Sequence, residues 1–165
     1  AVPTLALPFV DNFEFGLSPE WDVLLGEPFI KDGRLGSGTD SMRLSLNLYQ
    51  TDCTLEFDRE GYGQTIWQFT PNLRFVIEGP YSGAYNRWEV RREQEWTVQS
   101  EVLGFVQDGG YQFVILDNVY SIYLNGEQLS QIVYGQATPS PLLLTINRGY
   151  ASDEPFVDNV EVRCP

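Results

Sequence analysis

Residues 111–126, YQFVILDNVYSIYLNG, constrain the fold more than any other stretch of this chain. They contain two short runs rich in β-branched and aromatic residues, and each run ends in a polar pair, first Asp-Asn and then Asn-Gly. These residue types tolerate the positive φ angles that tight hairpin turns require. In the second run, Tyr120, Ile122 and Leu124 fall on one face of an extended strand,. The stretch therefore predicts antiparallel sheet.

Similar runs recur along the chain, with turn residues between nearly all of them. Strands are expected over residues 21–25, 29–31, 42–48, 53–58, 64–69, 73–78, 86–92, 96–102, 111–116, 119–124, 142–146 and 156–163,. The clearest alternation is MRLSLNL at 42–48, where four apolar side chains share one face,. No window shows a helical repeat. Many short strands predict an all-β fold, a two-sheet antiparallel β-sandwich of jelly-roll rather than immunoglobulin type, in a single domain spanning 1–165.

Composition excludes two classes of partner. The 165 residues are 42% hydrophobic, and no apolar run approaches the length of a membrane span,. The 23 acidic residues outnumber the 10 basic ones and give a formal net charge of −13. Such a charge repels the nucleic-acid backbone and anionic membrane surfaces. We therefore expect no nucleic-acid partner and no membrane insertion.

Several motifs resemble one family. The strand ending in IYLNGE at 122–127 resembles the apolar-x-apolar-Tyr-apolar-Asn-Gly pattern of laminin-G-like and other concanavalin A-like jelly rolls. The sequence FVDN at 9–12 recurs at 156–159, and FVDNVEV at 156–162 is similar to the Phe-x-Asp-Asn-Val-x-Val ending of many bacterial members. The opening, with its Asp-Gly-x-Leu turn at 32–35, is similar as well. The resemblance to concanavalin A-like lectins and glucanases implies adjacent first and last strands and sugar recognition by a secreted bacterial protein.

The two cysteines, Cys53 and Cys164, both fall on the inward parity of their strands,. They could meet in a disulfide that closes a long loop, which would suit an oxidising compartment. The alternative is two buried free thiols. The first residues, AVPTLALP, are typical of a start trimmed after cleavage of a signal peptide,. We therefore expect a secreted, extracellular or cell-surface location and a module of a larger secreted or surface protein.

Sequence patterns disfavour catalysis. Histidine is absent, which removes the Ser-His-Asp triad and the usual zinc sets,. The Glu-x-Asp-x-x-Glu strand of the glucanases that share this fold is not matched at residues 20–27, where the last Glu is displaced. Arginines that alternate with Glu89 and Glu93 would lower carboxylate pKa values rather than keep an acid protonated. A polysaccharide hydrolase or lyase stays as an alternative, and it requires two or more of these carboxylates to converge in a cleft: Glu56, Glu78, Glu89 and Glu101.

Sugar binding without catalysis needs an aromatic face for stacking beside groups that hydrogen-bond hydroxyls. Aromatic residues make up 14% of the chain, and several tyrosines lie in glycine-bracketed loops,. Strand parity places arginines and a glutamate opposite the apolar positions. The predicted carbohydrate-binding residues are Tyr62, Trp67, Arg74, Tyr81, Tyr85, Arg87, Glu89, Arg91 and Gln99. Trp21, Trp88 and Trp96 are set in apolar strands and are expected in the core,.

Calcium is the metal that this composition allows, because it takes oxygen ligands. If the two ends of the chain pair, five residues could converge as a structural calcium site: Asp11, Asn12, Asp153, Glu154 and Asp158. The alternative is that Asp11 and Asp158 cap turns or accept backbone hydrogen bonds. No organic cofactor is expected.

Together these patterns predict a non-catalytic carbohydrate-binding module that binds a polysaccharide or glycan by aromatic stacking and by hydrogen bonds from Arg and Glu. The enzyme above is one alternative. A structural or adhesion domain of an extracellular surface protein is the other.

Overall fold

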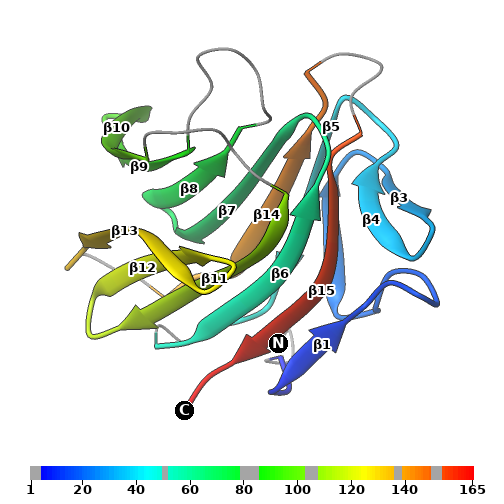
Figure 1. Cartoon of the computed structure of the whole chain (residues 1–165), viewed down its shortest axis with the longest axis horizontal. Coiled ribbons are helices and arrows are strands. Elements are labelled where there is room, and N and C mark those ends of the chain that lie inside the picture. Colours follow the sequence, from blue (N-terminus) through cyan, green and yellow to red (C-terminus); the bar gives the residue numbers. More distant parts are fainter. Residues whose placement is uncertain (1–4, 50–51, 79–85, 103–107, 136–138, 150–153) are drawn as a thin grey trace.

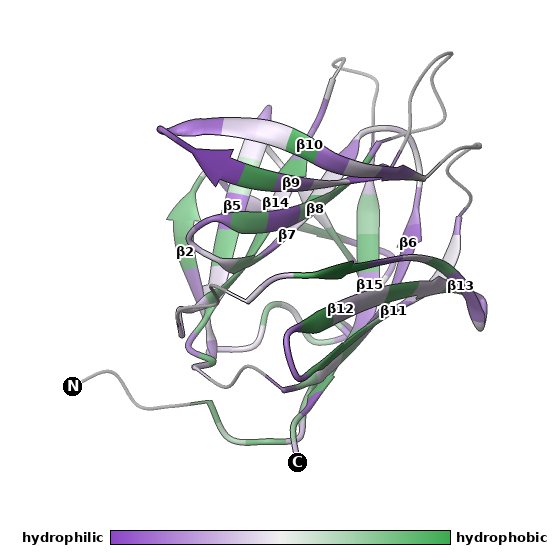
Figure 2. Cartoon of the chain, turned by 90° about the vertical axis from the view of Figure 1, so that its left-hand side faces the viewer, coloured by the Kyte–Doolittle hydropathy of each residue, from purple (hydrophilic) through white to green (hydrophobic). Residues whose placement is uncertain are grey.

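The computed structural model describes residues 5–49, 52–78, 86–102, 108–135, 139–149 and 154–165. None of these residues lies in a helix, so none offers a helix that is long and apolar enough to cross a membrane. Their strands pair antiparallel in two sheets that face each other as the layers of a sandwich (Figures 1 and 2). The predicted all-β sandwich is confirmed.

One sheet has eight strands. In spatial order these are β13 (Glu127–Val133), β12 (Val119–Leu124), β11 (Gly109–Leu116), β6 (Thr54–Glu60), β15 (Phe156–Arg163), β4 (Arg34–Ser37) and β3 (Pro28–Lys31), with β1 (Phe9–Asp11) paired to β15. The second sheet has seven strands: β10 (Glu95–Val102), β9 (Asn86–Arg92), β8 (Leu73–Ile77), β7 (Gln64–Thr70), β14 (Leu142–Asn147), β5 (Ser41–Leu46) and β2 (Trp21–Leu25).

The beginning and the end of the described chain lie side by side. Phe9 of β1 pairs with Val162 of β15, as the repeated FVDN motif and the family resemblance imply (Figure 1). Just after β15, Cys164 forms a disulfide with Cys53, which precedes β6. The predicted disulfide is therefore confirmed. A bond of this kind is typical of proteins that fold in an oxidising compartment.

The core lies between the sheets and is built largely of aromatic rings. Phe113 of β11 lies 5.6 Å from Phe75 and 5.9 Å from Trp88 between ring centroids, so rings from both sheets interdigitate. These edge-to-face contacts are the favoured arrangement of aromatic pairs. Trp21 and Trp88 are buried, as expected for strands with one inward face,.

Each of the expected strands is present, with ends that differ from the prediction by at most two residues. The sequence prediction missed β1, β4 and β13. The strand β4 has a glycine in its middle, and a Cβ built at Gly36 would lie 2.9 Å from the ring of Phe156, so the glycine admits that ring,. The strand β13 is an edge strand whose register with β12 shifts at a bulge, which hides its alternation,.

Candidate functional site

Several of the predicted carbohydrate-binding residues lie on the outer face of the seven-stranded sheet, which points away from the core. On β9, Trp88 and Val90 point into the core, while Arg87 and Glu89 point outward. The same alternation turns Gln64 of β7 outward. The side chains that meet here come from five strands or their ends, because side chains directly opposite across paired strands lie within contact distance.

A continuous chain of hydrogen bonds crosses this face. Ser41 donates from Oγ to Oδ1 of Asn147 at 2.6 Å, and Asn147 donates from Nδ2 to Oε1 of Gln64 at 2.7 Å. Gln64 then donates from Nε2 to Oε1 of Glu78 at 2.6 Å. The remaining links are ionic and lead to the β9 edge. We call the whole set the polar row: Ser41, Asn147, Gln64, Glu78, Arg87, Glu89 and Arg74.

Arg87 joins the two carboxylates of the polar row. It lies 2.9 Å from Oε1 of Glu78 through Nη1 and 2.7 Å from Oε2 of Glu89 through Nε. The other oxygen of Glu89 accepts a hydrogen bond from Nε of Arg74 at 2.7 Å. Both oxygens of this buried carboxylate are thus held by guanidinium groups, which is the strong, charge-assisted form of hydrogen bond,.

These contacts set the ionisation of the pair. Burial by itself raises the pKa of Glu89, but the hydrogen bonds from Arg87 and Arg74 outweigh burial and hold the pKa below its usual range,. For Arg87, burial lowers the pKa, and the hydrogen bonds to Glu89 and Glu78 outweigh it and raise the pKa. Glu89 is therefore an anion at neutral pH and a poor proton donor.

Trp96 lies beside the polar row. The guanidinium carbon of Arg74 is 4.1 Å from the centroid of the Trp96 ring, and this tryptophan is half-buried,. The expectation that Trp96 belongs to the core is therefore wrong. Its face is set by the two-residue turn at Glu93-Gln94, where both residues have positive φ, because this turn pairs Trp96 with the outward Arg91. Glu-Gln is not one of the usual residue pairs of such turns, so the sequence does not mark it.

The structure sorts the other predicted binding residues into three groups. Tyr62 is exposed at the turn between β6 and β7, and Arg91 and Gln99 are exposed near the β10 edge. Trp67 is fully buried between the sheets, so its prediction as a binding residue is wrong. The predicted Tyr81 and Tyr85 lie outside the described residues. Arg74, Arg87 and Glu89 are the predicted residues that the fold brings into direct contact.

Within the part of the chain that the structure describes, members of the expected calcium set form no cluster of three or more acidic side chains. Asp11 is buried, and its carboxylate accepts hydrogen bonds from the backbone of Phe13 and Ser18 and from Nε1 of Trp21, each at 3.0 Å. This is the turn-capping role that the sequence left open. Over the described ranges, no three His, Cys, Asp or Glu residues form a group able to hold a metal ion.

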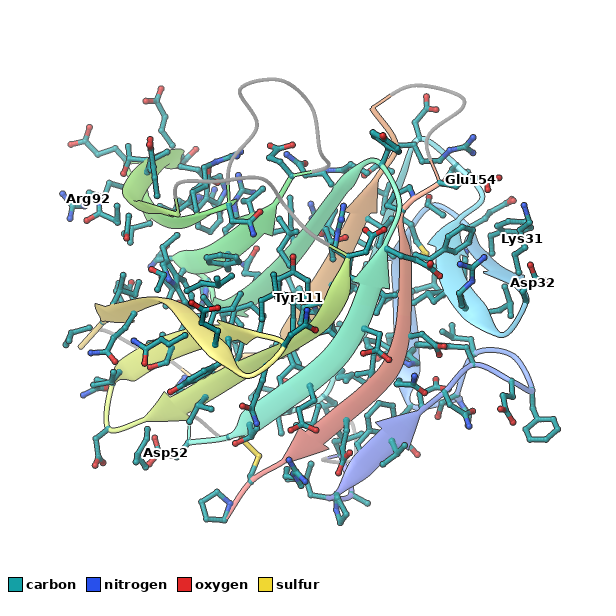
Figure 3. The ribbon with its side chains drawn as sticks, in the orientation of Figure 1. Lys31, Asp32, Asp52, Arg92, Tyr111 and Glu154 are labelled. Carbon is teal, nitrogen blue, oxygen red and sulfur yellow. A yellow bond between two sulfur atoms is a disulfide. The ribbon has the colours of Figure 1, made fainter. Side chains whose placement is uncertain are left out.

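The remaining members of the expected calcium set have other surroundings. Asn12 caps the backbone of Glu14, and Glu154 pairs with Lys31 at 3.3 Å (Figure 3). Asp158 lies opposite Asp58 on the outer face of the other sheet. Burial and the nearby Asp58 raise the pKa of Asp158. Asp153 is outside the described residues.

The carboxylates that the enzyme alternative requires are divided between the two sheets. Glu78 and Glu89 share Arg87 in the polar row. Glu56 lies on β6 of the eight-stranded sheet, where Gln112 and Arg163 each donate to it at 2.9 Å. Glu101 is exposed on β10.

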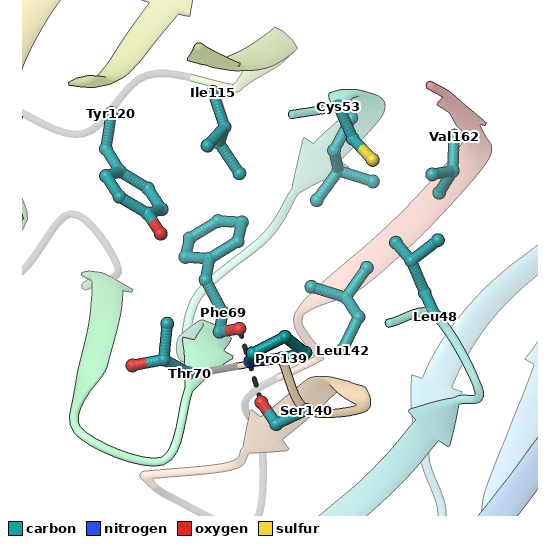
Figure 4. A pocket seen from close by; sticks show the side chains of 11 residues that line it. Leu48, Cys53, Phe69, Thr70, Ile115, Tyr120, Pro139, Ser140, Leu142 and Val162 are labelled. Carbon is teal, nitrogen blue, oxygen red and sulfur yellow. Dashed lines mark hydrogen bonds between the residues drawn. The ribbon is translucent and has the colours of Figure 1, made fainter. Parts of the chain in front are cut away.

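A small cavity lies between the sheets beside Cys53 (Figure 4). Its volume of about 30 Å³ is close to that of one water molecule, and its lining includes Leu55, Phe69 and Tyr120,. Burial, together with Tyr134 and Asp52 nearby, raises the pKa of Tyr120 to about 12. A sugar ring does not fit in this cavity.

No protein-family model matches the chain, and no curated protein resembles it in sequence. Solved structures do resemble it. The carbohydrate-binding module CBM66 from Bacillus subtilis matches with a TM-score of 0.70 at 10% identity, covering 98% of this chain and 99% of that chain. The exoplasmic/lumenal domain of VIP36, in its Ca2+/Man3GlcNAc-bound form, matches with a TM-score of 0.73 at 10% identity, covering 99% and 91%.

A Bacillus licheniformis β-glucanase matches with a TM-score of 0.71 at 11% identity, covering 96% of this chain and 98% of that chain. Lectins, binding modules and glucanases of this shape are concanavalin A-like jelly rolls. The chain therefore has the concanavalin A-like jelly-roll fold that its motifs resemble. Identities this low establish the fold alone.

Proposed function

We propose that this protein is a non-catalytic carbohydrate-binding module that holds a polysaccharide or glycan against the outer face of its seven-stranded sheet. Trp96 supplies the ring on which a sugar stacks, and the polar row supplies hydrogen bonds to sugar hydroxyls. The observation that carries the proposal is the contact between Trp96 and Arg74 at the end of an interlinked row of Arg, Glu, Gln and Asn side chains.

The chemistry of the polar row suits a sugar. Arginine carries five N–H donors and a carboxylate carries two acceptor oxygens, so neighbouring Arg and Glu groups match the paired hydroxyls of a pyranose. Arg74, Glu89 and Arg87 already restrain one another, which lowers the entropy lost when a ligand binds,. Such a surface gives modest affinity that multivalent attachment can raise.

The structural neighbours and the disulfide support the biological setting of this proposal. CBM66 is a carbohydrate-binding module, and VIP36 was solved with Man3GlcNAc bound, so jelly rolls of this shape host glycan sites. The Cys53–Cys164 disulfide favours an extracellular or lumenal compartment,. We place the protein outside the cell, as a module of a larger secreted or surface protein.

Affinity electrophoresis in gels that contain neutral polysaccharides tests the proposal. We expect Trp96→Ala to weaken retention at least about tenfold, because central tryptophan anchors commonly contribute more than 1.4 kcal/mol to binding. Leu116→Ala is the matched control, since Leu116 is an exposed apolar residue on the other sheet. If the wild type is retained by no glycan, or if the two variants behave alike, the proposal is wrong.

Two further measurements on the same panel separate the alternatives. Release of reducing sugar by the wild type would favour a hydrolase that uses Glu78 and Glu89, the carboxylates joined by Arg87. Repeating the gels with EDTA tests calcium. We expect retention to be unchanged by EDTA, because Asp11 and Glu154 of the expected calcium set are engaged by other groups.

A further inference from the structure

We infer that a groove between the β9–β10 hairpin and β13 binds the anionic group of an acidic polysaccharide, a uronate carboxylate or a sulfate ester, through Arg91 and Arg92. An acidic polysaccharide is one class of the glycans named in the proposed function, and its binding here rests on that function.

The groove lies where the edges of the two sheets come together. Ser100 of β10 and Ser130 of β13 approach within 3.4 Å through their Oγ atoms. Beside this contact is a groove of about 570 Å³, a size typical of ligand sites,. Arg92 lies at the rim of the molecule (Figure 3), and the turn end of the β9–β10 hairpin is hydrophilic (Figure 2).

The charge of the groove is opposite to that of the protein. Arg91 and Arg92 line it together with Gln99 and Tyr134, and no described lining residue carries a carboxylate. The chain as a whole has 23 acidic residues and a formal net charge of −13. Positive side chains gathered on a strongly negative protein favour a ligand that carries negative charge.

Among the described residues, the two arginines also differ from the other basic residues in having no side-chain partner. Both are exposed, and within the described ranges neither guanidinium makes a hydrogen bond or an ion pair. Elsewhere the basic side chains are engaged, for example Lys31 by Glu154 and Arg163 by Glu56. Arg91 and Arg92 are therefore available to a planar anion, which guanidinium binds through two parallel hydrogen bonds.

The groove adjoins the polar row. Arg91 is the register partner of Trp96, so a sugar stacked on Trp96 would present its neighbouring residue toward Arg91. The distant carboxylates of the protein oppose such a ligand weakly, because the screening length is about 8 Å at physiological ionic strength. Glu95 is the register partner of Arg92, and Glu93 follows Arg92 in the turn, so both carboxylates adjoin the hairpin arginines. Glu95→Gln should therefore strengthen binding of an acidic glycan.

Isothermal titration at 0.15 M salt tests the groove with three probes: an oligogalacturonate, dextran sulfate and unmodified dextran. We expect the double variant Arg91→Gln/Arg92→Gln to weaken binding of at least one acidic probe by about tenfold or more. The matched control is Lys31→Gln/Arg163→Gln, which removes the same charge from exposed ion pairs far from the groove. Thermal unfolding of each variant establishes that it is folded.

The outcomes separate the two proposals. Loss of oligogalacturonate binding alone identifies a uronate site, and loss of dextran sulfate binding alone identifies a sulfate site. If the double variant and its control weaken binding equally, the groove is not the binding site for the anionic group. If neutral polysaccharides bind through Trp96 but no acidic probe binds, the groove is wrong and the proposed function stands. If acidic probes bind through the arginines and neutral ones do not, the groove is correct, the protein is still a glycan-binding module, and the outer face does not bind neutral polysaccharides by itself.

Discussion

Arg74 on β8 donates a hydrogen bond of 2.7 Å to Glu89, its register partner on β9. Because Arg87 holds the second oxygen of Glu89 at 2.7 Å, one buried carboxylate fixes two guanidinium groups on the outer face. The contacts of Glu89 with Arg74 and Arg87 stabilise the sheet. They also set the spacing of the N–H donors that a ligand would meet.

Replacing Glu89 by Gln should lower the free energy of unfolding at pH 7 by about 1 to 3 kcal/mol, because both arginines lose an ionic partner. The pKa of Glu89 is lowered in the folded state, so its contribution is present above the ordinary value of 4.5 and is lost as the pH falls below it,. Urea denaturation at several pH values should show the difference from wild type shrinking in acid. Exposed Glu101→Gln is the control, and a difference independent of pH would contradict the assignment.

Removing the disulfide with Cys53→Ala/Cys164→Ala should cost about 2 to 5 kcal/mol, because the bond joins positions 111 residues apart and restricts the unfolded chain,. The measurement is chemical denaturation with and without a reductant. Reductant should destabilise the wild type and leave the variant unchanged. Equal stability of the two oxidised proteins would show that the bond adds nothing.

Tyr120→Phe should remove part of the alkaline loss of stability. The folded-state pKa of Tyr120 is raised from 10.0 to about 12, so its contribution is complete below pH 10 and declines as the pH rises toward 12,. A shift of that size corresponds to about 2 to 3 kcal/mol at most. Thermal unfolding between pH 9 and 12 should decline less steeply in the variant, with exposed Tyr49→Phe behaving like the wild type.

Asp158→Asn should raise stability slightly at pH 7, by about 0.5 kcal/mol. Burial and the facing Asp58 raise the pKa of Asp158, so the folded state favours the uncharged form, and the amide supplies that form at every pH. The gain should vanish in acid, where Asp158 is protonated in both the folded and unfolded states. Exposed Asp22→Asn is the comparison, and a destabilised Asp158→Asn would show that the 2.8 Å hydrogen bond from the Asn159 amide to Oδ1 outweighs burial and Asp58.

Alternation and turn chemistry made most of the sandwich predictable, because both are local properties of the sequence. The same parity placed Arg74, Arg87 and Glu89 on one face of neighbouring strands. Strand parity does not predict the burial of Trp67, because β7 carries apolar residues on both of its faces and has no clear inward side,.

The other errors depend on contacts that parity does not contain. Trp96 was misplaced because its face follows from the hairpin turn rather than from its own strand. The hydrogen bond from Trp21 to Asp11 likewise links residues ten positions apart through a folded turn, which the sequence pattern does not contain. The groove at Arg91 and Arg92 exists because the edges of two different sheets meet, and no single stretch of sequence encodes that meeting.

The position of the cystine has a mechanical consequence. Tension applied at Pro165 passes through Cys164 directly into Cys53 and so reaches β6 without peeling β15 from its neighbours. Tension applied before β1 first meets Leu5, which is buried and donates a backbone hydrogen bond to Asn47, and then β1, which is held by three register pairs. Under a stretching force the oxidised protein should therefore yield first at Leu5 and β1, while β15 stays in place until the disulfide is reduced.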